Sequence, residues 1–225
     1  MNNNYKINNN NYKKFIQNLS NKKIFLIQVF STLIFQIFIA YVVLLYAEHN
    51  NLINKMHHIL LVALAGFIII ITIGLIKSRI IRILLLTLFS GIVGLLLSYR
   101  LDLNNEDQNE LVKKSFLTTV IIFIYIVIFG FFLSFLGARI SFKVSMALFL
   151  ALLVLIIAIF ILSISGKYPL YKKGIAGVVI LLFSCFIAYD TVQILDRNYN
   201  GDFIDGSLDY FLDFINLFSG LLNYN

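Results

Sequence analysis

The sequence predicts an all-α membrane protein: a bundle of seven transmembrane helices in which a short, polar-faced last helix is enclosed by the other six. Three observations favour this fold class. Of the 225 residues, 60% are hydrophobic, and the mean hydropathy is +0.90. Only 13% are charged, about half the roughly 25% of an ordinary soluble domain. The apolar residues also form long runs rather than an amphipathic pattern, so a bilayer is the expected solvent for most of the chain.

The first 23 residues differ from the rest in composition. They are rich in Asn and Lys, with runs of Asn at 2–4 and 8–11, and such a segment cannot bury a core. We therefore expect residues 1–23 to be a disordered cytoplasmic tail and residues 24–225 to be one membrane domain. The first apolar run, 24–47, exceeds the roughly 7 to 15 apolar residues of a cleavable signal peptide, which predicts a retained membrane helix.

Six further apolar runs are expected to follow as helices. They cover residues 59–76, 80–99, 116–136, 144–165, 174–195 and 207–222. At about 1.5 Å per residue, the first six runs of the chain can cross a hydrocarbon core of about 30 Å.

The seventh run is different because it contains Asp209 and Asp213. Charged aspartates facing lipid would cost about 5 to 7 kcal/mol, whereas the large apolar residues of this run contribute about 3 to 5 kcal/mol. This helix should therefore lie inside the bundle. Asp209, Asp213 and Asn216 recur every three or four residues, so they share one helix face that can turn toward partners or water.

The loop charges favour a cytoplasmic N-terminus. Eleven Lys and Arg then lie on the cytoplasmic side and seven on the other, although the three lysines of loop 166–173 oppose this bias. The net charge of +7 therefore fits basic loops beside a membrane, and no basic and aromatic patch outside the apolar runs indicates nucleic acid. A single cysteine, Cys185, excludes an internal disulfide.

Two aspartates in the last two runs are the leading functional candidates. Asp190 lies in the sixth run and Asp213 in the seventh, and the short polar loop between the runs predicts a helical hairpin. Two carboxylates held close in a poorly solvated site share a proton, which predicts a pH-sensing and gating pair. The pair can also hold Ca²⁺ transiently, although this ion prefers six to eight oxygens. The alternative is structural: each aspartate bonds a neighbouring helix or a buried arginine.

Basic partners for these aspartates lie between the second and third runs. Arg79 and Arg82 are on the same predicted side as Asp190, so either can form a salt bridge that protonation would release. Alternatively, both only anchor the helix in the cytoplasmic interface.

Two sets of residues predict helix contacts. On the first helix, Gln28, Thr32 and Gln36 form a stripe that lines an aqueous path or makes interhelical hydrogen bonds. On the third helix, small residues recur at every fourth position, which favours close packing. They are Ser90, Gly94 and Ser98.

No motif predicts a cofactor or an enzyme. There is no His-Glu-x-x-His, no Gly-rich loop ending in Gly-Lys and no Gly-x-Ser-x-Gly. His57 and His58 are adjacent but have no further Cys or His nearby, which is too few ligands for zinc. We expect neither catalytic residues nor a bound cofactor.

Two motifs near the end of the chain, FIAYDT at 186–191 and LDFINLF at 212–218, resemble those of the Bax inhibitor family, also called the transmembrane Bax inhibitor motif or Lifeguard family. Weaker similarity extends back to about residue 24. The resemblance implies a seven-helix bundle and a pH-sensitive Ca²⁺ leak channel. Eukaryotic members suppress cell death in the endoplasmic reticulum, Golgi or plasma membrane, which also implies apoptosis-regulating membrane proteins as partners.

Carried over position by position, the family's paired aspartates correspond to Asp190 and Asp213, and its gating arginine falls near Arg79 or Arg82. The sequence also departs from its relatives. Run 59–76 has no acidic residue where some relatives have a glutamate, and Val192 stands where many have a glutamine.

Two other functions compete with the leak channel. Intramembrane aspartyl proteases also place aspartates on neighbouring helices, but their Gly-x-Gly-Asp motif is absent around Asp213, and their Pro-Ala-Leu element is absent from a chain whose only proline is Pro169. A non-conducting scaffold that regulates apoptosis through partner proteins remains an alternative, since fold does not decide function.

Overall fold

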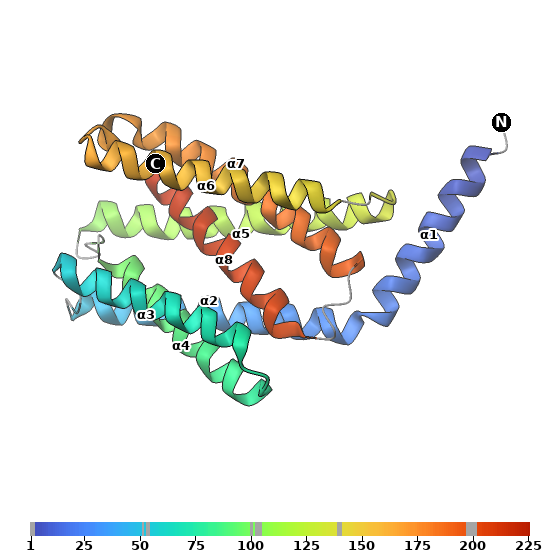
Figure 1. Ribbon diagram of the computed structural model, residues 1–225, viewed down its shortest axis with the longest axis horizontal. Helices are drawn as coiled ribbons and strands as arrows, with labels where there is room; N and C mark the ends of the chain where they lie inside the picture. Colours follow the sequence, from blue (N-terminus) through green and yellow to red (C-terminus); the bar gives the residue numbers. More distant parts are fainter. Residues whose placement is uncertain are drawn as a thin grey trace. The chain divides into compact units, whose positions relative to one another are not determined.

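The computed structural model describes residues 3–50, 52, 55–99, 101, 105–138, 141–196 and 202–225, with the backbone alone at 3–11, 56, 142 and 196. Within these residues the regular structure consists of eight helices and no strand (Figure 1). The helices are α1 (Asn3–Asn21), α2 (Lys23–His49), α3 (Met56–Leu75), α4 (Arg79–Ser98), α5 (Glu106–Phe135), α6 (Phe142–Ile164), α7 (Tyr168–Asp196) and α8 (Phe203–Tyr224).

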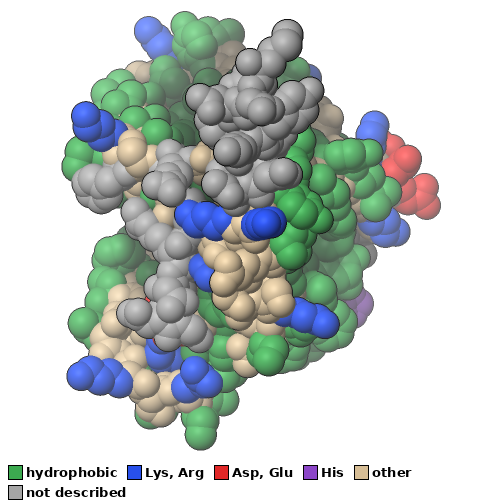
Figure 2. All heavy atoms as spheres, turned by 90° about the vertical axis from the view of Figure 1, so that its right-hand side faces the viewer, with side chains coloured by type: hydrophobic (Ala, Val, Ile, Leu, Met, Phe, Trp, Pro, Cys, Tyr) green, Lys and Arg blue, Asp and Glu red, His purple; other side chains and the backbone are tan. Residues whose placement is uncertain are grey.

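Six of these helices, α2 to α7, are long and apolar enough to cross a membrane. The 20 residues of α3 or α4 span about 30 Å, the thickness of a hydrocarbon core. Large apolar side chains on these helices are exposed, as Leu60 (73%) and Leu75 (77%) illustrate, and Figure 2 shows such side chains in green over much of the visible face. Exposed apolar side chains on this scale are suited to contact with lipid.

Helix α8 is not among these six candidate spans. Its aspartates lower its hydropathy, whereas its large side chains are buried: Ile204, Tyr210 and Leu217 are each 0% exposed. The count of seven transmembrane helices and the enclosure of the last helix remain predictions.

Helix α1 lies within the segment for which the composition predicts a disordered tail. Tyr12 and Phe15 contact the ring of Phe135 at centroid distances of 6.1 and 5.7 Å. These aromatic contacts stabilise the segment, and a count of Asn and Lys residues does not reveal them. The division of the chain into a tail and a membrane domain at residue 23 stays a prediction.

The chain divides into two compact units. Unit 1 comprises Met1–Leu26, Leu111–Asp202 and Leu212–Asn225, and unit 2 comprises Ile27–Glu110 and Phe203–Phe211. The first half of α8 therefore packs within unit 2 and its second half within unit 1.

Unit 2 depends on a close approach between α2 and α4. A Cβ atom at Gly94 would lie 2.3 Å from the carbonyl oxygen of Ala40, so no larger residue fits there. Ser90 and Ser98 on the same face of α4 are 0% and 5% exposed. The predicted small-residue packing face of the third helix is therefore confirmed.

Unit 1 is held together by aromatic rings and a second close approach. Phe214 of α8 contacts Phe116 and Phe123 of α5 at centroid distances of 5.9 and 5.6 Å. A Cβ atom at Gly130 of α5 would lie 2.5 Å from the Cβ of Thr191, so α5 and α7 touch directly beside Asp190.

Candidate functional site

Arg82 lies in the first turn of α4 and is the most buried arginine among the described residues, with 8% of its surface exposed. It shares a buried helix face with Leu86 and Phe89, four and seven residues further on. Its guanidinium therefore enters the interior of unit 2 from the end of the helix.

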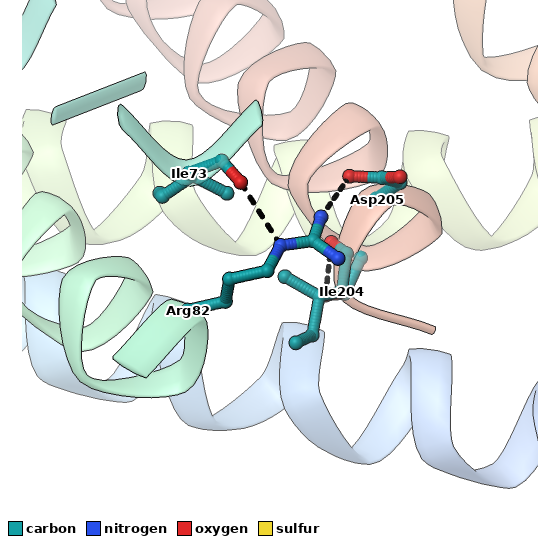
Figure 3. A network of polar contacts seen from close by, with 5 residues as sticks. Ile73, Arg82, Ile204 and Asp205 are labelled. Atoms are coloured by element: carbon teal, nitrogen blue, oxygen red, sulfur yellow. Dashed lines mark hydrogen bonds and ion pairs between the residues drawn. The ribbon is translucent and has the colours of Figure 1, made fainter. Parts of the chain in front are cut away.

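Groups of unit 2 bind this guanidinium (Figure 3). Its Nη2 lies 2.5 Å from Oδ1 of Asp205, and its Nε donates to the carbonyl oxygen of Ile73 at 3.0 Å. Ile73 lies in the last turn of α3, where carbonyl oxygens have no partner within the helix. Arg82 therefore links the end of α3, the start of α4 and the start of α8.

Asp205 is the functional candidate that sequence reasoning missed. The sequence predicts Arg79 or Arg82 as partner of Asp190 or Asp213, whereas Asp205 falls in the short polar loop expected between the last two runs. The structure instead places Asp205 in the first turn of α8 and pairs it with Arg82. An acidic residue at the start of an apolar run was the available signal, because a helix N-terminus favours negative charge.

Arg79 also contacts the start of α8. Its guanidinium carbon lies 5.6 Å from the ring centroid of Phe203, which is a cation–π geometry. Both predicted arginines therefore contact the first turn of α8. Arg82 forms an ion pair with Asp205, and Arg79 lies over the ring of Phe203.

Asp190 and Asp213 both belong to unit 1. Asp213 is only 5% exposed and Asp190 is half-buried. Their helices touch at Gly220, where a Cβ would lie 3.0 Å from Cγ1 of Ile180.

The contacts between α7 and α8 also fix their relative direction. Beyond Gly220 on α8, Tyr224 lies opposite Gly177, which precedes Ile180 on α7, so the two helices run antiparallel. From the Gly220 contact, Asp213 is about 10 Å back along α8 and Asp190 about 15 Å forward along α7. Measured along the helix axes, the aspartates differ in depth by about one turn, while their role as a gating pair stays a prediction.

The end of α7 carries a basic cap. Lys22 donates from Nζ to the carbonyl oxygens of Ile194 and Leu195, both at 2.9 Å. These carbonyl oxygens belong to the last turn, where a cation also interacts favourably with the helix dipole. Lys22 belongs to the segment expected to be a tail, so the sequence does not predict this contact.

The remaining polar residues of the predicted site differ in their surroundings. Gln36 is 1% exposed, and within the described part of the chain neither its Nε2 nor its Oε1 has a hydrogen-bond partner. Gln28 on the same helix is exposed. Asp209 and Asn216 of α8 are half-buried, and Asn216 donates to the carbonyl oxygen of Leu212 in its own helix.

The described residues include no group of three or more His, Cys, Asp or Glu side chains suited to holding a metal ion. The rings of His57 and His58 contact each other at a centroid distance of 4.3 Å. A cation that meets the described aspartates would therefore need oxygens from water or the backbone as well.

The comparison with known proteins agrees with the motifs around these aspartates. Residues 22–224 match the family described as inhibitor of apoptosis-promoting Bax1, or Bax1-I. The chain belongs to this family. The match confirms the resemblance to the Bax inhibitor family and places the chain among apoptosis-related membrane proteins. Together with the six apolar helices, it makes the protein an integral, multi-pass membrane protein.

Similar curated proteins include one from Campylobacter jejuni and one from Helicobacter pylori, both described as uncharacterised. The first is 38% identical over 63 residues, 28% of this chain and 27% of the relative. The second is 41% identical over 54 residues, 24% of this chain and 23% of the relative. The chain thus spans about a quarter of the length of these relatives.

The Bax inhibitor family is in general one of non-enzymatic channels and regulators.

Proposed function

We propose that the protein is a pH-sensitive cation leak channel with Ca²⁺ as a permeant ion. In this mechanism Asp190 and Asp213 sense pH, and the ion pair of Arg82 with Asp205 holds the closed state. The partners are the lipid bilayer and Ca²⁺, and suppression of cell death would follow from a lower stored Ca²⁺ level.

The observation that carries the proposal is the position of the Arg82–Asp205 pair. It joins the start of α8 to α3 and α4 through one buried guanidinium. The Asp205 side chain is 49% exposed, so protons from solution can reach it. A charge-assisted bond of this kind is stronger than a neutral one, so loss of the charge on Asp205 would loosen the start of α8.

The two aspartates of unit 1 are the acid-sensitive element of the proposal. Because α7 and α8 are packed antiparallel, protonation of either carboxylate changes the charge within the same helix pair. In this mechanism flux should rise as the pH falls.

A buried amide on α2 supports a hydrated path. Gln36 offers one donor group and one acceptor that no described residue satisfies, and a hydrated cation in transit can satisfy both. Of the two roles predicted for its stripe, the structure therefore favours the aqueous path over an interhelical hydrogen bond at this residue.

The test is Ca²⁺ flux into liposomes that contain the purified full chain, across a pH series. We expect flux to increase with acidification, Asp213→Asn to lose this dependence, and Asp205→Asn to conduct at pH values where the original is closed. Asp107→Asn, which alters an exposed carboxylate at the start of α5, is the matched control and should behave as the original. Flux no greater than in protein-free liposomes at every pH would refute the channel and favour a scaffold.

A further inference from the structure

A groove lies between α6 and α7 within unit 1, with a volume of about 600 Å³. This volume is within the usual range of roughly 300 to 1,000 Å³ for sites that bind small molecules. Its walls are apolar along most of their length, from Ala151 to Leu162 on α6, which is about 16 Å of helix. One end is polar, where Lys167 and Tyr171 contribute to the lining.

Small residues create the groove. Ala151 and Ala158 are seven residues apart, so they lie two turns apart on one face of α6. On α7, Gly174 also lines the groove, and a Cβ atom there would meet nothing within 4 Å. With these small residues facing one another, α6 and α7 leave a groove between them.

The polar end of the groove carries an unbalanced positive charge. Lys167, Lys172 and Lys173 are all exposed, and none forms an ion pair with a described residue. The sequence contains no Asp or Glu from residue 111 to residue 189, so α6 and α7 offer no acidic neighbour until Asp190. These are also the lysines that oppose the loop-charge bias, so the topology of the chain in the membrane does not explain their positive charge.

We propose that this groove binds an anionic phospholipid, with an acyl chain between α6 and α7 and the phosphate at Lys167. The apolar walls complement the chain, and the lysines complement the headgroup. Tyr171 has the amphipathic ring that favours the boundary between hydrocarbon and headgroups, and its hydroxyl can donate to the phosphate. A free phosphate ion would use only the polar end and leave the apolar walls without a ligand.

The absence of tryptophan from the chain provides a direct assay. Tyr171→Trp introduces the sole tryptophan at the polar end of the groove and replaces the O–H donor by the N–H donor of the indole. The protein is reconstituted in phosphatidylcholine vesicles with increasing fractions of brominated phosphatidylglycerol or, in parallel, brominated phosphatidylcholine. Quenching should report an apparent affinity about fivefold higher for the anionic lipid, the effect of one lysine near a membrane surface.

Two further substitutions in this background test each half of the site. Lys167→Gln should bring the two affinities within twofold, while Lys143→Gln, at the opposite end of α6, should leave the preference unchanged. Ala158→Phe should fill the groove and abolish the preference. The matched control is Ile157→Phe, because Ile157 is 56% exposed and does not line the groove.

Equal quenching by the two lipids in the reporter protein would overturn the proposal, as would a preference that survives Lys167→Gln. Relief of the quenching by inorganic phosphate would assign the site to a free anion and would also overturn it. The assay measures no cation flux, so its outcome is independent of the channel proposal.

Discussion

Replacing Gln36 by Met should stabilise the fold and lower the proposed cation flux. The side chain is 1% exposed, and neither of its polar atoms has a hydrogen-bond partner among the described residues. Burying a polar group without a compensating hydrogen bond costs about 1 to 3 kcal/mol. Methionine has nearly the same length and volume and no such group, so the substitution removes the cost and preserves packing.

The size of the effect follows from these terms. An imperfect fit of the methionine can cost up to about 1.5 kcal/mol, so we expect a net gain of about 1 to 2 kcal/mol in the free energy of unfolding. For a chain of this length that corresponds to an increase in Tm of about 2 to 8 °C. Gln28→Met on the same helix is the control: Gln28 is exposed, so its stability should change by less than about 0.5 kcal/mol.

Thermal unfolding of the purified chain in detergent measures stability, and Ca²⁺ flux in liposomes measures the second effect. The variant should be more stable and conduct less, because the amide that a hydrated cation would meet in the proposed path is gone. A loss of 1 kcal/mol or more on Gln36→Met, with Gln28→Met unchanged, would show that the amide is satisfied in the membrane. That result would refute the reasoning.

Three other substitutions test contacts seen in the structure. Gly94→Ala should destabilise unit 2 by about 2 kcal/mol, because the new Cβ would lie 2.3 Å from a backbone oxygen of α2. In the control, Gly74→Ala, the new Cβ enters open space and should stabilise the protein by up to about 1 kcal/mol. Thermal unfolding measures both effects. Asp205→Asn should cost about 1 kcal/mol, a small value because Asp205 is half exposed; thermal unfolding measures it, and a gain in stability would contradict the pairing with Arg82. Lys22→Met should remove two bonds to the end of α7 at a cost of about 1 to 2 kcal/mol, and hydrogen exchange should accelerate in the last turn of that helix but not in α4.

The sequence predicted the existence of the apolar helices better than their ends. Run 24–47 corresponds closely to α2 (Lys23–His49), whereas run 116–136 misses the first ten residues of α5 (Glu106–Phe135). The missing turns begin with Glu106 and Asp107, which suit a helix N-terminus but do not register as hydrophobic. Helix α1 was missed for a similar reason, since its contacts are aromatic and specific rather than compositional.

The sequence could predict those residues of the candidate site whose chemical type alone calls for a partner. Arg82 was singled out because an arginine beside a membrane run needs a partner or an interface, and it is buried and paired. Its partner Asp205 was not predictable, because Asp-Gly is a common turn sequence and only the packed fold brings the start of α8 to the end of α3.

This geometry also determines what loss of the Asp205 charge can release. When this residue is neutral, as in Asp205→Asn, Arg82 keeps its bond to the carbonyl oxygen of Ile73. The link between α3 and α4 therefore persists while the link to α8 weakens, so the change is confined to the start of one helix. A gate of this kind needs no rearrangement of the apolar helices, whose close contact at Gly94 leaves little room for one. In the proposed mechanism, α8 is consequently the element that moves, and α2 to α4 are the frame against which it moves.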